Sequence, residues 1–184
     1  MTDDAPQSAE ETTGASPLLD PAHADFIEKM GLQVESTGWM PRMSGRVLGA
    51  LLVSDGPVTQ SELREALLAS LGAISGATRD LLAKRLAQRV HIPGSRQAGL
   101  QLHPDAWRIL EEDGLRGVQD YLSLAAGGLL DIGNADSPSS QNLQRMRDYF
   151  AEVEERMLSV IAWLDSTSPD PHAHNREGTA ERRS

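Results

Sequence analysis

A stripe of apolar residues near the C-terminal end has the most regular spacing in this sequence. Its members lie alternately three and four residues apart, and they are Leu143, Met146, Phe150, Val153, Met157, Val160 and Leu164. This alternation corresponds to the a and d positions of a heptad repeat, the pattern of a helix that packs lengthwise on another helix. We predict a helix over residues 140–165 whose stripe packs on its twin in a homodimer. The alternative is that the stripe packs on the core of its own chain.

Upstream of this stripe, apolar residues recur at helical spacing until the period changes near residue 89. Helices are expected at about residues 22–36, 41–52, 59–67, 72–85 and 105–130. Residues 89–92 and 100–102 are predicted strands, joined by a turn at residues 93–96. The order helix, helix, hairpin is typical of a winged helix-turn-helix. The glycines at 127–128 and the Gly- and Pro-containing residues 133–138 are expected to separate the last two helices.

The predicted fold class is therefore mainly α with a small β-wing, combining a winged helix-turn-helix domain with a helical dimerisation region. The expected boundaries are an acidic disordered arm at 1–21, the winged domain at 22–104, the dimerisation region at 105–165 and a disordered tail at 166–184. The first helix is expected to be shared with the dimerisation region. Both ends are predicted to be disordered because their polar composition offers little burial to offset the entropy of ordering.

Charge is distributed unevenly along the chain, although the net charge is −10. Residues 42–96 hold eight Lys or Arg against four Asp or Glu, whereas residues 97–165 hold five against twelve. A basic segment between acidic ones favours a local surface that binds a polyanion. The alternative is a chance fluctuation in solvated charge.

Composition also excludes several classes of protein. The chain has no cysteine, so it has no disulfide framework, thiolate nucleophile or Cys-ligated metal. It has no apolar run long enough to span a membrane and no signal-peptide start, so we expect a cytoplasmic protein without membrane contact. No histidine pairs with acids at a catalytic or metal-binding spacing, and no Gly-rich phosphate loop is present. We expect neither an enzyme nor a cofactor or metal.

Four tracts carry a resemblance to a known family. They are GWMPRMSGRVLG at 38–49, ASLGAISGATR at 69–79, PGSR at 93–96 and RMRDYF at 145–150. Together they resemble the GbsR-type branch of the MarR-like winged-helix transcription regulators, over about residues 24–165. The resemblance implies a homodimer that binds double-stranded DNA, with the 72–85 helix in the major groove and the hairpin near the backbone or minor groove. Such a protein would be associated with the nucleoid when bound to DNA.

The recognition helix implied by this resemblance has two faces. Ile74, Ala77 and Leu81 are expected to point inward, which leaves Ser75, Gly76 and Arg79 on the outward face. Arg79 is a candidate for a two-pronged contact with a guanine edge, Gly76 permits close approach, and Ser75 donates to a phosphate or base.

Four further residues are candidates for phosphate contact. Ser70 is expected to cap the recognition helix and to leave backbone N–H groups for a phosphate. Arg42, Arg46 and Arg96 are the other three. For Arg42 and Arg46 the alternative is an internal salt bridge to an acidic helix.

Two possibilities remain open at this stage. Trp39, Met40, Met43 and Trp107 are candidates for a site that binds a small-molecule effector, and the alternative is that they are ordinary core residues. The alternative function is a winged-helix module that contacts proteins and has no specific DNA binding. The net negative charge of the chain slightly favours this protein-binding alternative.

Overall fold

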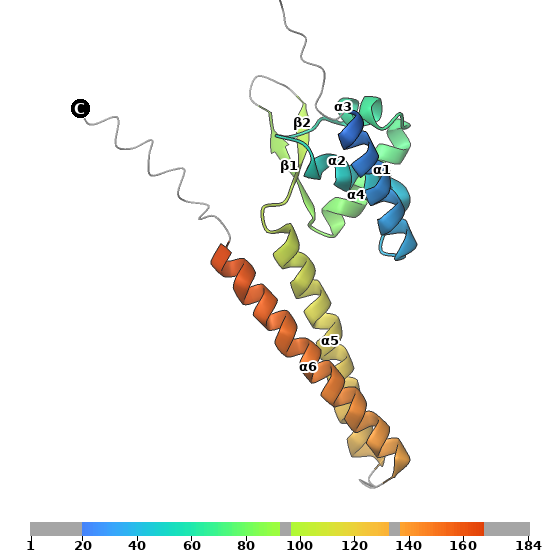
Figure 1. Cartoon of the computed structure of the whole chain (residues 1–184), viewed down its shortest axis with the longest axis vertical. Helices are drawn as coiled ribbons and strands as arrows, with labels where there is room; N and C mark the ends of the chain where they lie inside the picture. Colours follow the sequence, from blue (N-terminus) through green and yellow to red (C-terminus); the bar gives the residue numbers. More distant parts are fainter. Residues whose placement is uncertain (1–19, 93–96, 133–136, 168–184) are drawn as a thin grey trace, which may run out of the picture. The chain divides into compact units, whose positions relative to one another are not determined.

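A computed structural model of the chain describes residues 20–92, 97–132 and 137–167. The two tails predicted to be disordered lie almost wholly outside these residues. The chain divides into two compact units, one comprising residues up to 83 with 87–102, the other residues 84–86 and those from 103 onward. Figure 1 labels the elements of both units.

The first unit contains four helices and a hairpin within the residues described. They are α1 (Pro21–Ser36), α2 (Arg42–Leu52), α3 (Gln60–Ala66), α4 (Leu71–Ala83), β1 (Ala87–His91) and β2 (Ala98–Leu102). The two strands are antiparallel, with Ala87 opposite Leu102. Val58, in the segment before α3, joins the other side of β2 through two 2.8 Å backbone hydrogen bonds with Leu100. The predicted fold class, mainly α with a small wing, is confirmed.

Local sequence signals determine where these helices begin. The Oγ1 of Thr59 accepts a hydrogen bond from the backbone N–H of Glu62, and the Glu62 carboxylate accepts one from the N–H of Thr59. This is a capping box, a pattern set by residues three apart in the sequence, and it satisfies two N–H groups that a helix start leaves unpaired. The Oγ of Ser70 accepts from the N–H of Ala73 at 3.2 Å, so Ser70 caps α4 as expected.

Helices α1 and α2 cross closely because glycines lie at their contact. A Cβ added to Gly45 would lie 2.8 Å from the Cβ of Val34 and 3.0 Å from the Cα of Gly31. A Cβ added to Gly49 would lie 3.2 Å from the Cα of Ile27. Contacts this short leave no room for a larger residue, so the glycines allow the backbones to approach and bury Ile27 and Val34.

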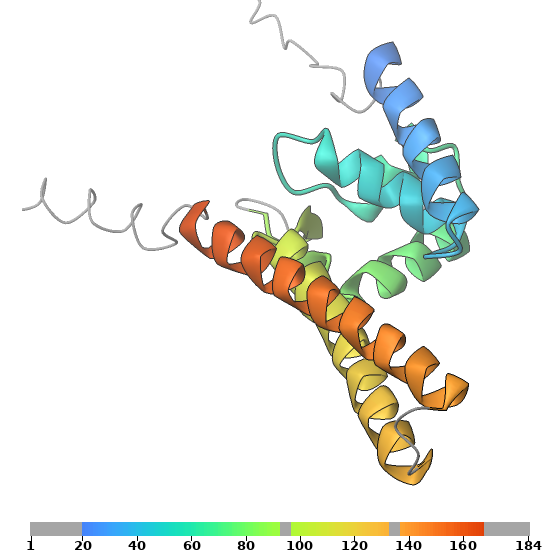
Figure 2. The same cartoon turned by 60° about the horizontal axis from the view of Figure 1, so that its bottom comes forward.

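The second unit is an antiparallel pair of long helices, α5 (Ala106–Ile132) and α6 (Pro138–Thr167), which lie side by side in both Figure 1 and Figure 2. The rings of Tyr121 and Phe150 stack with their centroids 4.6 Å apart. Where the start of α5 meets the end of α6, Arg108 Nε donates a hydrogen bond to Asp165 Oδ1 at 2.6 Å. This hydrogen bond and the charge of Asp165, with a smaller contribution from Glu112, raise the pKa of Arg108.

The heptad stripe of α6 meets α5 of the same chain along much of its length. Besides the stacked Phe150, a Cβ at Gly114 would lie 2.8 Å from the Cε of Met157, and one at Gly128 would lie 2.9 Å from the Cδ1 of Leu143. One expectation is not met: the glycines at 127 and 128 do not end the helix, because α5 continues through them to Ile132. Gly128 serves as a close-packing position within the helix.

The stripe departs from its heptad spacing near the C-terminal end of α6. Val160 is 40% exposed. The neighbouring Ile161 and the stripe residue Leu164 are half-buried. The buried edge of α6 therefore shifts by one residue after Met157.

Candidate nucleic-acid interface

Helix α4 has the two faces predicted for a recognition helix. Ile74, Ala77 and Leu81 are buried, as expected. On the other side Arg79 is exposed, and its Nε makes only a long, 3.4 Å hydrogen bond to the carbonyl oxygen of Ser75. A Cβ added at Gly76 would meet no atom within 4 Å. The backbone at Gly76 is therefore open to close approach by a partner.

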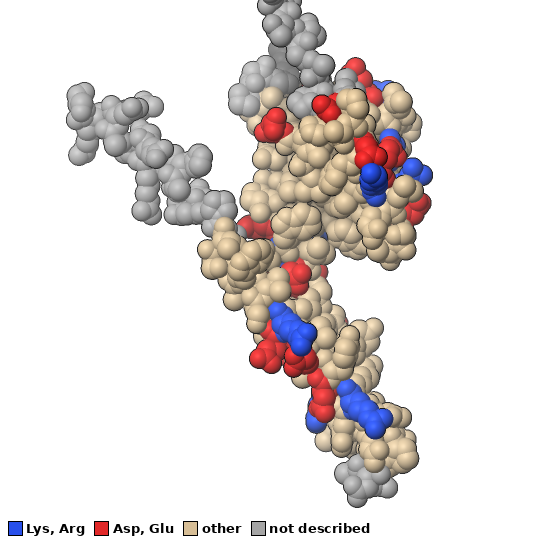
Figure 3. All heavy atoms as spheres, viewed as in Figure 1, with Lys and Arg blue, Asp and Glu red and all other residues tan. Residues whose placement is uncertain are grey.

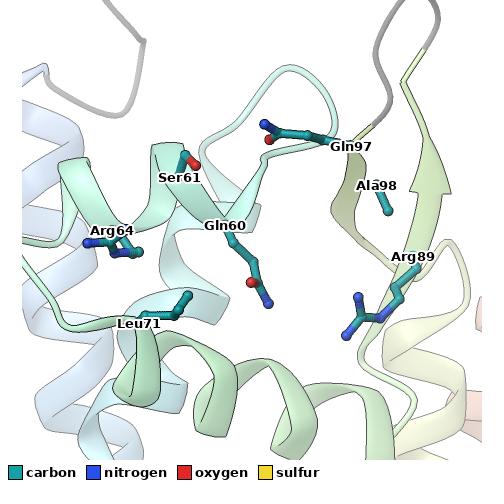
Figure 4. A pocket seen from close by; sticks show the side chains of 7 residues that line it. All are labelled: Gln60, Ser61, Arg64, Leu71, Arg89, Gln97 and Ala98. Atoms are coloured by element: carbon teal, nitrogen blue, oxygen red, sulfur yellow. The ribbon is translucent and has the colours of Figure 1, made fainter.

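Beside the N-terminal end of α4 lies an open depression of about 340 Å³. Figure 4 shows the residues that line it, which come from α3, α4, β1, the start of β2 and the residue before it: Gln60, Ser61, Arg64, Leu71, Arg89, Gln97 and Ala98. We call this feature the α3–α4–wing depression. Two of its residues, Arg64 in α3 and Arg89 in β1, are cationic and exposed, and the guanidinium of Arg89 points into the open space in Figure 4. A concave surface with two cations and several amide or hydroxyl groups suits a polyanion such as the DNA backbone.

Arg64 and Arg89 are not among the predicted phosphate ligands, although both lie in the basic segment. Strand alternation gave no signal for Arg89, because residues 87, 89 and 91 share one face of β1 and Ala87 on that face is buried. For Arg64 no local signal was available, because its place at the depression depends on how α3 packs beside the wing.

Arg42 and Arg46 both pair with Glu28 of α1. Arg42 Nη2 lies 3.1 Å from one Glu28 oxygen, and Arg46 Nη2 lies 2.5 Å from the other. Arg46 also donates to the carbonyl oxygen of Leu67 at 3.0 Å, and its side chain is only 18% exposed, against 47% for Arg42. The structure thus places both arginines in the internal salt bridge that was their alternative role.

The remaining candidate residues differ in exposure. Ser70 is exposed at the start of α4. Arg96 lies outside the described residues. Met40 is buried in the core of the first unit, and Trp39 and Met43 are half-buried there. Trp107 is partly exposed and belongs to the second unit.

In the part of the chain that the structure describes, no group of three or more His, Asp or Glu residues is close enough to hold a metal ion. None of the helices in residues 20–92, 97–132 and 137–167 combines the length and apolar character needed to cross a membrane.

Comparison with known proteins assigns the chain to a family. The sequence profile of the MarR family matches residues 40–98, which run from before α2 into β2. The HTH-type transcriptional regulator MmpR5 of Mycobacterium tuberculosis is 37% identical over 144 residues, covering 77% of this chain and 86% of that protein. The chain belongs to the MarR family. The putative HTH-type transcriptional regulator YvaV of Bacillus subtilis is 30% identical over 91 residues, covering 50% of this chain and 51% of that protein.

A solved structure agrees with this assignment. A crystal structure described as a transcriptional regulator has 33% sequence identity and a TM-score of 0.62, and the match covers 79% of this chain and 99% of that one. As a MarR-family protein the chain is a DNA-binding transcriptional regulator and not an enzyme. The narrower GbsR-type assignment stays a prediction.

Proposed function

We propose that this MarR-family regulator binds an inverted repeat in double-stranded DNA as a homodimer, with α4 of each copy in the major groove. The observation that carries the proposal is the outward face of α4, where exposed Arg79 and uncovered Gly76 lie on a helix fixed from behind by buried Ile74 and Leu81. A major groove admits an α-helix, and side chains on its outward face reach the base edges.

Within this arrangement the contacts divide into two kinds. Arg79 reads a guanine edge and Ser75 donates to a base or phosphate, while the bare backbone at Gly76 allows the groove floor to come close. Arg64 and Arg89 bind phosphates from the α3–α4–wing depression. Such contacts position the protein on the duplex without reading its sequence.

The other predicted phosphate ligands have different surroundings. Ser70 contacts phosphate at the start of α4, and Arg96, which lies between β1 and β2 in the sequence, is a further phosphate ligand of this proposal. Arg42 is half-exposed and leaves Glu28 to reach DNA. The internal role of Arg46 is supported by its low exposure and two partners, so we leave it out of the interface.

A second copy of the chain covers the exposed apolar side chains of α5 and α6. In the described part of this helix pair the large exposed ones are Trp107, Tyr121, Leu124, Leu130, Ile132, Tyr149, Leu158, Val160 and Trp163. Contiguous apolar surface on a soluble protein marks an interaction site. On the face of the helix pair drawn in Figure 3, charged side chains of both signs lie among uncharged surface, and charged residues are expected at the rim of such an interface.

An apolar small molecule adjusts DNA affinity in this proposal. Trp39 and Met43 in the first unit, and separately Trp107 in the second unit, remain candidate contact residues for such a molecule because each keeps exposed surface. Met40 is better explained as a core residue. A ligand of this kind acts only if it prefers one conformation of the dimer.

The test starts from selection of bound sequences out of random duplex DNA with the purified full chain. We expect an inverted repeat to be enriched, and its affinity to fall steeply as salt rises because phosphate contacts release counterions. Screening apolar metabolites against that duplex then tests the effector. No enriched sequence, together with no specific gel shift, would support the alternative of a winged-helix module that contacts proteins.

A further inference from the structure

Leu71 is an apolar side chain in a polar setting. It is the first residue of α4, it is 55% exposed, and it lines the α3–α4–wing depression. Its neighbours there include Gln60, Arg64 and Arg89, which Figure 4 shows around the same open space. Single exposed leucines are common on protein surfaces, so exposure alone assigns no role to Leu71.

The face of α4 beside Leu71 carries no covering atoms. Cβ atoms added at Gly72 and Gly76 would each meet nothing within 4 Å. These glycines are four residues apart and share a helix face. They form a bare strip of backbone that begins next to Leu71 and leads to exposed Arg79. The two ends of the strip are about 12 Å apart along the helix, so a partner that extends along the strip from Arg79 to its start also meets Leu71.

We infer that Leu71 is a specificity-determining residue that contacts the C5-methyl group of a thymine in the major groove. The inference rests on the proposed docking of α4 on DNA. Among the four bases only thymine presents a methyl group in the major groove, and apolar side chains are what recognise it. Arg79 and Leu71 then read two chemically different features of one half-site, a guanine edge and a methyl group.

Replacement of thymine by deoxyuridine tests this contact, because it removes one methyl group and keeps every hydrogen-bonding atom. Starting from the selected duplex, each thymine is replaced in turn and the affinity of the full chain is measured. We expect one position in each half-site to lose affinity about fourfold, the effect of uncovering one buried methyl-sized group, and the loss to multiply when both half-sites are changed. The other thymines should tolerate the change.

The Leu71→Ala variant decides whether Leu71 makes the contact. This variant should bind the duplex with thymine at the sensitive position and the duplex with deoxyuridine there with affinities within about twofold of each other. The loss of the Leu71 side chain and the loss of the methyl group remove the same interaction, so their effects are not additive. Leu68→Ala is the matched control. Leu68 is 94% exposed on the turn before α4 and does not line the depression, so the variant should keep the full discrimination. Circular dichroism checks that both variants are folded.

The outcomes separate this inference from the proposed function. Enrichment of a DNA sequence without any methyl-sensitive thymine would overturn the role of Leu71 and leave the DNA-binding proposal standing. The same would follow if Leu71→Ala kept the discrimination of the parent protein. Failure to enrich any sequence would overturn both.

Discussion

The hydroxyl group of Ser44 donates a 2.7 Å hydrogen bond to the Oδ2 of Asp80, linking the buried face of α2 to α4. Ser44 is only 1% exposed, so it has little access to water as an alternative partner. Asp80 follows Arg79 directly in the sequence. The bond therefore fixes the rotation of α4 one residue from the side chain proposed to read DNA.

Removal of this bond should lower the stability of the fold and, because it loosens α4 next to Arg79, the affinity for DNA. We expect Ser44→Ala to lower the free energy of unfolding by about 1–2 kcal/mol. The Asp80 carboxylate loses a hydrogen-bond donor, and because Asp80 is only half-exposed, water replaces that donor only in part. Urea unfolding measures the loss. Ser159→Ala is the control, since Ser159 is exposed and donates only to a carbonyl within its own helix. Equal free energies of unfolding for the two variants would show that the Ser44–Asp80 bond does not stabilise the fold.

Arg46 and Arg42 should differ sharply in what they contribute to stability. Arg46→Ala removes a partner from Glu28 and from the Leu67 carbonyl in a poorly exposed setting, so we expect a loss of about 1–3 kcal/mol. Arg42→Ala removes a half-exposed ion pair and should cost less than about 1 kcal/mol. Thermal unfolding checks the order. If Arg46→Ala unfolds like the parent and only weakens DNA binding, Arg46 belongs to the interface after all.

Gly76→Ala should separate stability from DNA binding. Alanine fits at position 76 without a clash and is favoured over glycine inside a helix by about 1 kcal/mol, so the variant should unfold at a higher urea concentration. Its DNA affinity should fall, because the added methyl group stands where the groove approaches. Gly117→Ala, at an equally open position in α5, provides the comparison for the gain in stability. If the DNA affinity of Gly76→Ala is unchanged, the major groove does not approach the backbone at Gly76.

Arg79 and Arg89 should affect DNA binding in different ways. Arg79→Ala is expected to weaken binding to the selected sequence by about 1–3 kcal/mol and to relax its preference at one base pair. Arg89→Ala should weaken binding to all sequences alike and reduce the slope of log affinity against log salt by about one. Fluorescence anisotropy over a salt series distinguishes them. Identical specificity ratios in the parent and in Arg79→Ala would exclude base readout by Arg79.

The sequence was sufficient where structure depends on neighbours along the chain. The capping box of Thr59 and Glu62 and the cap by Ser70 involve groups three residues apart, so they could be predicted without knowledge of the fold. The inward face of α4 followed in the same way from helical spacing. These local features, with the change of period near residue 89 within β1, were enough to predict the winged helix-turn-helix.

Features that depend on how helices cross could not be predicted in this way. The partners of Arg46 lie 18 and 21 residues away, and the charge pattern alone fits an ion pair and a phosphate contact equally well. Likewise a heptad stripe indicates that a helix packs lengthwise on a partner, but not which partner. The structure places much of the stripe against α5, where Gly114 and Gly128 make room for Met157 and Leu143.

This packing changes which substitutions should separate a dimer. Phe150 stacks on Tyr121 of its own chain, so Phe150→Glu should destabilise the helix pair itself, by about 2–4 kcal/mol, through lost packing and a poorly solvated charge. Trp163 is 61% exposed on α6, so a charge there meets water in the isolated chain and is buried only if a second copy covers it.

We therefore expect Trp163→Glu to yield folded monomers and Phe150→Glu to lose helicity as well. Sedimentation velocity at micromolar concentration measures the first effect, and circular dichroism during heating measures the second. Arg147→Glu is the control, because Arg147 is an exposed α6 residue whose ion pair is with the adjacent Asp148. Trp163→Glu should also lose affinity for an inverted repeat while keeping weak binding to a single half-site, since only the dimer engages both. If the parent protein sediments as a monomer, the exposed apolar side chains of α5 and α6 are not a self-association surface, and the inverted-repeat proposal fails.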